Sequence, residues 1–181
     1  TRGWRRRDNR AVNSHAGLAQ ISAVVCLTEI ETPETDRSAN GVVADNLYVG
    51  TAEDATDDLV LEFQGVTTIV SLTHETPNPA AQDLTLRSIP LIDGPQNSRE
   101  QFTKAVEETV AALAADESVL VHCSAGASRS PTVAATALAL AQNMDLADAV
   151  QQVADNRAAV DPHEALLRQA AHVYTTLSSG Y

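Results

Sequence analysis

A run of three apolar residues, Val119-Leu120-Val121, constrains the possible folds more than any other feature of this chain. A strand with one face in water alternates apolar and polar residues, whereas a strand buried on both faces is apolar throughout. The run therefore predicts a central strand that is covered on both sides, as in an α/β sheet. A loop of small residues and then a helical pattern follow it directly.

Strand and helix patterns alternate along the chain after Gly41. Runs of apolar and β-branched residues predict further strands at 47–49, 66–72 and 84–89. Apolar residues at helical spacing predict helices at 52–64, from about 98 to 113, and at 131–142, 145–155 and 163–177. This alternation predicts an α/β domain whose central, mostly parallel sheet is flanked by helices.

Two helices carry recognisable signals at their ends. The helix at 52–64 is expected to bury a face formed by Leu59, Val60 and Phe63, and Gly65 is expected to end it. Ser98 is a suitable N-cap for the next helix, and Gln101 would complete a capping box. The residues expected to share the buried face of that second helix are Phe102, Ala105, Val106, Thr109, Val110 and Leu113.

Residues 1–40 show no sustained periodicity and end in a polar run. We expect them to form a flexible N-terminal extension, in which a short strand could form at 23–27. A single domain is expected at 41–181, and no internal repeat is apparent.

The chain is strongly acidic, because 12 Lys and Arg against 24 Asp and Glu give a net charge of −12. Five arginines fall within residues 1–10, and Lys104 is the only lysine. Since such a surface repels phosphates, we expect neither nucleic acid nor an anionic membrane as a partner. An acidic, Ala-rich composition almost without Lys favours a salt-loving archaeal source over an ordinary acidic bacterial one.

Two cysteines, Cys26 and Cys123, are too few for a disulfide scaffold, which favours a reducing, cytoplasmic compartment. The N-terminal arginines could begin a secretion signal, but residues 16–30 contain too many polar side chains for its apolar core. No run reaches the roughly 18 apolar residues of a membrane helix. Cys123 is therefore interpreted as a chemical group rather than as half of a structural bridge.

The segment after the buried strand has the features of an anion-binding loop. Cys123 is followed by five small residues, then by Arg129 and a helix. The five residues, whose backbone amides are expected to bind phosphate, are Ser124, Ala125, Gly126, Ala127 and Ser128. Small side chains let these amides converge, and the helix N-terminus behind them adds positive potential. The segment predicts a cradle of phosphate size.

The same loop carries groups suited to nucleophilic chemistry. A positive environment lowers the pKa of a thiol, so Cys123 is expected to be a nucleophile at neutral pH. The planar guanidinium of Arg129 can bond two phosphoryl oxygens, and the Ser130 hydroxyl can donate to the sulfur when the thiolate leaves.

The run from His122-Cys123 to Arg129-Ser130 resembles the signature of the cysteine-dependent protein phosphatases, which is His-Cys, any five residues, Arg and Ser or Thr. Its small residues resemble the dual-specificity group in particular. Residues 46–50 resemble the opening strand of that family, and residues 89–93 resemble the segment that carries its general acid. The resemblance covers residues 41–181, which would form the catalytic domain.

The resemblance implies an enzyme that hydrolyses phosphotyrosine and phosphoserine or phosphothreonine on proteins, without a metal or a cofactor. Cys123 would attack phosphorus while Asp93 protonates the leaving oxygen, and Asp93 would then activate water against a phosphocysteine. Amides of residues 124–129 and the Arg129 guanidinium would stabilise the transferred group. His122 would position the loop through hydrogen bonds, and Asp83 is a weaker alternative to Asp93 as the acid.

Two departures from the family pattern bear on these roles. Asp161-Pro162-His163 stands where the family often has Pro-Asn, which leaves open whether His163 braces the loop. Ala125 and Ala127 occupy positions where relatives specific for inositol lipids place Lys, so such lipids are not expected substrates.

Two alternative functions remain open from the sequence. A rhodanese-like sulfurtransferase also has a Cys at the head of an anion-binding loop, but Ser130 and Asp93 favour phosphoryl chemistry. A non-catalytic, phosphate-recognising pseudophosphatase would commonly lack the Cys, Arg or Asp, and all three are present. The oligomeric state stays open.

Overall fold

The computed structural model describes residues 41–79, 83–157 and 159–179. The extension predicted at 1–40, with its short strand and Cys26, lies outside the described residues. Within them, the strands are β1 (Gly41–Ala44), β2 (Leu47–Gly50), β3 (Thr68–Ser71), β4 (Thr85–Ser88) and β5 (Val119–His122). They form one sheet in the order β1-β2-β5-β3-β4, in which only the β1–β2 pair is antiparallel. The predicted α/β fold with a mostly parallel sheet is confirmed.

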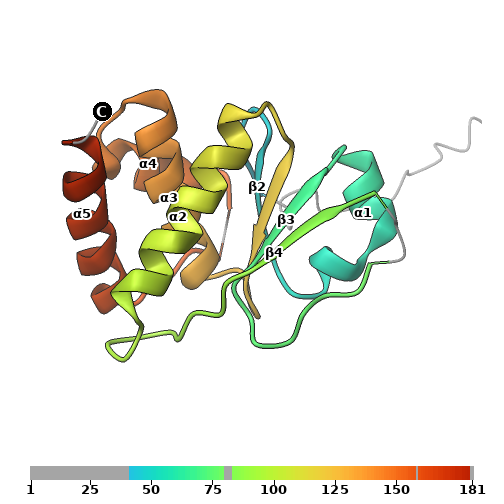
Figure 1. Ribbon diagram of the computed structural model, residues 1–181, viewed down its shortest axis with the longest axis horizontal. Coiled ribbons are helices and arrows are strands. Elements are labelled where there is room, and N and C mark those ends of the chain that lie inside the picture. The colour runs from blue at the N-terminus through green and yellow to red at the C-terminus, as the bar shows by residue number, and fades with distance from the viewer. Residues whose placement is uncertain (1–40, 80–82, 158, 180–181) are drawn as a thin grey trace, which may run out of the picture. The chain divides into compact units, whose positions relative to one another are not determined.

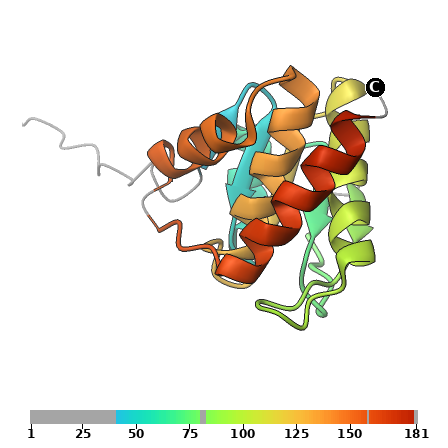
Figure 2. The ribbon, with the colours of Figure 1, turned by 90° about the vertical axis from the view of Figure 1, so that its left-hand side faces the viewer.

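Helices cover both faces of this sheet (Figure 1), and Figure 2 shows the larger helical layer in front of it. One face carries α2 (Arg99–Ala114), α3 (Arg129–Gln142), α4 (Leu146–Asp155) and α5 (Glu164–Ser178), and the other carries the short 3₁₀ helix η1 (Asp54–Thr56) and α1 (Asp58–Phe63). Val119 and Val121 of β5 enter the core under α2–α5, whereas Leu120 enters a second core with Leu61 and Ile69. The apolar run is thus a central strand buried on both faces, as predicted.

The prediction for residues 52–64 is wrong in detail. The segment divides into η1 and α1 because the Asp57 carboxylate accepts hydrogen bonds from the backbone N–H groups of Leu59 and Val60, which starts a new helix. Leu59 and Phe63, expected in the core, are 78% and 82% exposed, whereas Leu61 is 2% exposed. Helix α1 therefore packs through Leu61 rather than through the predicted face.

Strand β1 is an element that the sequence prediction missed. It pairs with β2 through a two-residue turn in which Asn46 has a φ of 63°. Asn tolerates this left-handed conformation better than most residues, which makes the tight hairpin feasible. The sheet accordingly has one antiparallel edge.

The long helices agree closely with their predictions. Ser98 caps α2 by accepting a hydrogen bond from the Gln101 N–H at 3.4 Å. Phe102, Ala105, Val106 and Thr109 are buried, while Val110 and Leu113 are only partly buried. Helix α3 begins two residues earlier than predicted, at Arg129. No helix among the described residues is long and apolar enough to cross a membrane.

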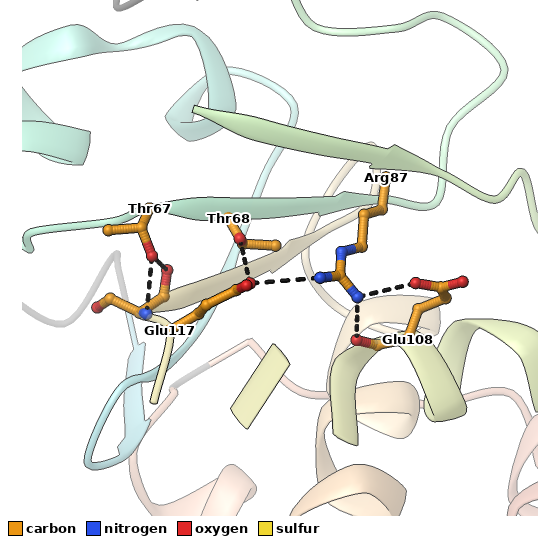
Figure 3. A network of polar contacts seen from close by, with 6 residues as sticks. Thr67, Thr68, Arg87, Glu108 and Glu117 are labelled. Atoms are coloured by element: carbon orange, nitrogen blue, oxygen red, sulfur yellow. Dashed lines mark hydrogen bonds and ion pairs between the residues drawn. The ribbon is translucent and has the colours of Figure 1, made fainter. Parts of the chain in front are cut away.

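Strand β4 lies at the other edge of the sheet, and a polar network holds it (Figure 3). Arg87 of β4 donates to the Glu108 carboxylate of α2 at 2.8 Å and to the Glu117 carboxylate at 3.4 Å. Glu117, just before β5, also accepts from the Thr68 hydroxyl of β3. Because most side chains of β4 are exposed, this network supplies contacts that apolar packing does not.

Candidate active site

The candidate site lies where three parallel strands end. Gly50 of β2 and Ser71 of β3 both pair with His122, the last residue of β5. The chain then forms the loop 123–128 and enters α3 at Arg129. Loops that follow the carboxyl ends of parallel strands are the usual ligand-binding positions in α/β sheets. The fold therefore places the predicted anion-binding loop at the carboxyl ends of the strands, where ligands usually bind.

Cys123 lies at the floor of this loop and is 2% exposed. Its sulfur accepts hydrogen bonds from the Ser130 hydroxyl and from the Gly126 N–H, each at 3.2 Å. Burial raises the pKa of the thiol, but the bonds from Ser130, the positive charge of Arg129 and the Gly126 N–H together outweigh it and lower the pKa. The environment stabilises the thiolate, which is the reactive form.

Arg129 is oriented by backbone oxygens from two neighbouring segments. One terminal nitrogen donates to the carbonyl of Leu72 at 3.3 Å and to that of Leu91 at 3.1 Å, and the other donates to the Ser124 hydroxyl at 3.0 Å. The Nε atom is buried and has no hydrogen-bond partner among the described residues. Nε is thus available to an anion in the loop.

Asp93 is brought to the loop by a side-chain hydrogen bond. Its Oδ1 accepts from the Ser128 hydroxyl at 2.7 Å, and the Ser128 oxygen in turn accepts from the His163 backbone N–H at 3.0 Å. Asp83 precedes β4 and so lies at the amino-terminal end of the parallel strands, opposite the loop. Of the two candidate acids, Asp93 is the one near the loop.

His122 does not hold the loop in the way expected. Its ring is 1% exposed, and neither ring nitrogen makes a hydrogen bond to any described residue. Burial lowers the pKa of His122 to about 4, although the neighbouring Cys123 backbone and the Asp54 carboxylate offset part of the shift and the Arg129 charge adds to it. The ring is therefore neutral at pH 7, and it makes no hydrogen bond to any described residue that could position the loop.

The side chain of His163 does not brace the loop either. Its Nδ1 accepts from the Ala165 N–H at 3.0 Å, which makes His163 the N-cap of α5. Backbone groups act instead: the Asp161 N–H donates to the Ala127 carbonyl at 2.8 Å, and the His163 N–H donates to Ser128. The segment 161–163 therefore braces the loop through its backbone rather than through a side chain.

Arg157 is a residue of the site region that sequence reasoning missed. It follows α4, is 5% exposed, and donates from Nε to the Gly126 carbonyl at 2.8 Å. No motif contains it, so the sequence offered no signal for it. Among the described residues there is also no group of three or more His, Cys, Asp or Glu that could hold a metal ion.

A sequence model described as the catalytic domain of dual specificity phosphatases matches residues 47–175. The chain belongs to the dual-specificity phosphatase family. Dual specificity protein phosphatase 1 of Arabidopsis thaliana is 28% identical over 151 residues, which are 83% of this chain and 76% of that protein. Dual specificity protein phosphatase 22 of Mus musculus is 32% identical over 124 residues, which are 68% and 67% of the two chains.

Solved structures of the family agree with this fold. A mouse putative dual specificity phosphatase, crystallised with zinc tungstate, superposes with a TM-score of 0.75 at 26% identity, over 83% of this chain and 96% of that one. Human DUSP28 superposes with a TM-score of 0.70 at 26% identity, over 77% and 95% of the two chains. The protein is a cysteine-dependent phosphatase of the dual-specificity type. Membership of this family favours phosphoryl transfer over the sulfurtransferase alternative.

Proposed function

We propose that this phosphatase acts through a phosphocysteine formed on Cys123. In the first step the thiolate attacks phosphorus, the S–P bond forms, and the P–O bond to the substrate breaks. Asp93 donates its proton to the leaving oxygen, so the product departs as a neutral phenol or alcohol. The contact that supports this proposal most is the pair of hydrogen bonds that Ser130 and Gly126 donate to the sulfur.

The second step returns the enzyme to its starting state. Asp93, now a carboxylate, takes a proton from a water molecule whose oxygen attacks phosphorus, and the S–P bond breaks. The released thiolate regains the hydrogen bond from Ser130, which makes sulfur a better leaving group. Inorganic phosphate and protonated Asp93 are the products of this step.

Negative charge on the transferred group is stabilised by the loop itself. Arg129 can turn its unpartnered Nε and a terminal nitrogen to two phosphoryl oxygens as a fork. Backbone N–H groups of residues 124–129 supply further donors in the same cradle.

The substrates we propose are phosphotyrosine and phosphoserine or phosphothreonine side chains of proteins. Ser124 and Ala125 on the loop are exposed, which supports a shallow site that shorter phosphorylated side chains can also enter. Ala125 and Ala127 add no cation to the loop, which disfavours inositol phosphates with several charges.

The thiolate chemistry also supports a reducing compartment for this enzyme, because a catalytic thiol must stay reduced. The net charge of −12 and the single lysine support adaptation of the protein to high salt.

The proposal is tested with Cys123→Ser, with Cys26→Ser as the matched loss of the chain's other thiol. We expect Cys123→Ser to lose at least about a thousandfold in turnover of an aryl phosphate and of a phosphopeptide panel. Rapid denaturation during turnover of a radiolabelled substrate should leave phosphate on the wild type and on Cys26→Ser. Retention of more than about a tenth of the activity by Cys123→Ser would contradict the assignment.

A further inference from the structure

Arg157 is buried behind the phosphate loop and bonds two segments that are far apart in the sequence. Its Nε donates to the Gly126 carbonyl at 2.8 Å, and a terminal nitrogen donates to the Val49 carbonyl of β2 at 3.0 Å. A guanidinium stays charged at any working pH, and burying it is costly unless its donors are bonded. Arg157 therefore connects the loop to the end of β2.

The loop needs such a connection at Gly126. This residue has a φ of +66°, and its N–H points to the Cys123 sulfur. Glycine adopts positive and negative φ with similar ease, so the local sequence does not fix this conformation. The bond from Arg157 to the Gly126 carbonyl fixes it from outside, because the direction of the carbonyl depends on the backbone angles at that residue.

Close packing shows that Arg157 and Gly126 form one unit. A side chain at residue 126 would overlap the Arg157 guanidinium and would lie 2.9 Å from the Gly50 carbonyl oxygen. The same Gly50 oxygen accepts from the Cys123 N–H at 3.4 Å and lies 3.4 Å from the oxygen of Ser130, whose proton bonds the sulfur. The end of β2, Arg157 and the loop thus share a single set of contacts around the nucleophile.

We propose that Arg157 is a positioning residue for catalysis: it holds the Gly126 carbonyl away from the site and so keeps the Gly126 N–H on the Cys123 sulfur. The inference rests on the proposed role of Cys123 as the nucleophile. Without Arg157, Gly126 can rotate, and the sulfur loses the hydrogen bond from the Gly126 N–H. The pKa of the thiol then rises, and the cradle loses an amide for the phosphoryl group.

Four other charged or titratable groups act on the thiol or on residues beside it. The Arg129 charge acts on the Cys123 thiol, the Asp54 carboxylate of η1 acts on the adjoining His122, and Asp93 accepts from the Ser128 hydroxyl of the loop. All four remain in each variant below, so a change in the titration of Cys123 reports on the substituted residue.

The test compares Arg157→Met and Arg157→Lys with Arg168→Met, which removes the same charge from an exposed arginine paired with Glu164 on α5. All are made in a Cys26→Ser background, so that Cys123 is the only thiol. The rate of alkylation by iodoacetamide is measured against pH. We expect Arg157→Met to raise the pH midpoint of alkylation by about one pH unit or more, because the thiolate loses one hydrogen bond. Arg168→Met should leave this midpoint unchanged.

Catalysis gives a second readout. At a pH below the wild-type midpoint, kcat/KM of Arg157→Met should fall by about tenfold or more. Arg157→Lys keeps the charge but replaces the two bonding nitrogens of the guanidinium with a single ammonium, so its kcat/KM should lie between those of the wild type and Arg157→Met. An unchanged midpoint in folded Arg157 variants overturns this inference while the proposed function stands. A wild-type midpoint at the value of a free thiol contradicts the proposed function itself.

Gly126→Ala covers the case in which Arg157→Met does not fold. The added methyl overlaps the Arg157 guanidinium, and alanine is also strained at a φ of +66°, so both effects loosen the Gly126 conformation and the alkylation midpoint should rise as well. Combined with Arg157→Lys, it should raise the midpoint no further than the larger single effect, because both changes break the same contact. A wild-type midpoint in Gly126→Ala, or additive shifts in the double variant, would overturn the proposal.

Discussion

The buried ring of His122 should make the stability of the domain depend on pH in mildly acidic solution. Burial lowers the pKa of His122 from 6.5 to about 4, so the folded state disfavours the proton that the unfolded chain binds readily. Neutral His122 is fully compatible with folding above pH 6.5, and its contribution is lost progressively as the pH falls toward 4. The free energy of unfolding should therefore decrease on acidification through this window.

The size of the effect follows from the shift. Each unit of pKa difference corresponds to about 1.4 kcal/mol, so the full shift limits the loss to about 3 kcal/mol. Carboxylates also titrate at these pH values, and a comparison with His122→Gln isolates the imidazole. Gln keeps a polar side chain of similar length but takes up no proton.

The assay is urea unfolding of the wild type, His122→Gln and His172→Gln at several values between pH 8 and pH 4.5. His172→Gln removes an exposed imidazole from α5 and serves as the control. The stability of the wild type relative to His122→Gln should fall by about 2–3 kcal/mol between pH 7 and pH 4.5. A difference that stays constant across this range would refute the argument, because it would mean that His122 titrates alike in the folded and unfolded states.

Three further predictions test the role of Asp93 as the general acid, the packing of the core, and the effect of the net negative charge on stability. Asp93→Asn should lower the turnover of substrates with poor leaving groups by about 10²–10⁴ and that of activated aryl phosphates by less. Ser128→Ala removes the hydrogen bond to Asp93 and should have a smaller effect of the same pattern, and steady-state assays measure both variants. Phe63→Ala should change the free energy of unfolding by less than about 0.5 kcal/mol, whereas Phe102→Ala should cost about 3–5 kcal/mol in denaturant titrations. Melting temperature should rise between about 0.1 M and about 1 M KCl, because the Debye length shortens from roughly 10 Å to roughly 3 Å and screens the excess of acidic side chains; a flat or falling value would contradict salt adaptation.

The parts of the molecule that the sequence predicted are those whose partners are close in the sequence. Strand β5, the loop and α3 are contiguous, so the apolar run, the small residues and Arg129 could be interpreted together. The error at 52–64 has the opposite origin. Leu59 and Phe63 have helical spacing, but spacing does not show that Asp57 restarts the helix or that α1 meets the sheet through Leu61. In a helix of six residues, the cap sets where the helix begins, and packing against Ile69 and Leu120 sets which side chain is buried.

The two arginines of the site region show where the limit lies. Arg129 belongs to a contiguous motif, and its chemistry could be predicted from the order of the residues alone. Arg157 contacts Gly126 at a separation of 31 residues and Val49 at a separation of 108, and its burial arises only when the segment after α4 meets the loop and the end of β2. An arginine in a polar segment after a helix is ordinarily exposed, and its substitution would be expected to change little. In this phosphatase the conformation of the glycine beside the nucleophile depends on it, so the chemistry is encoded locally while the geometry that makes it effective is not.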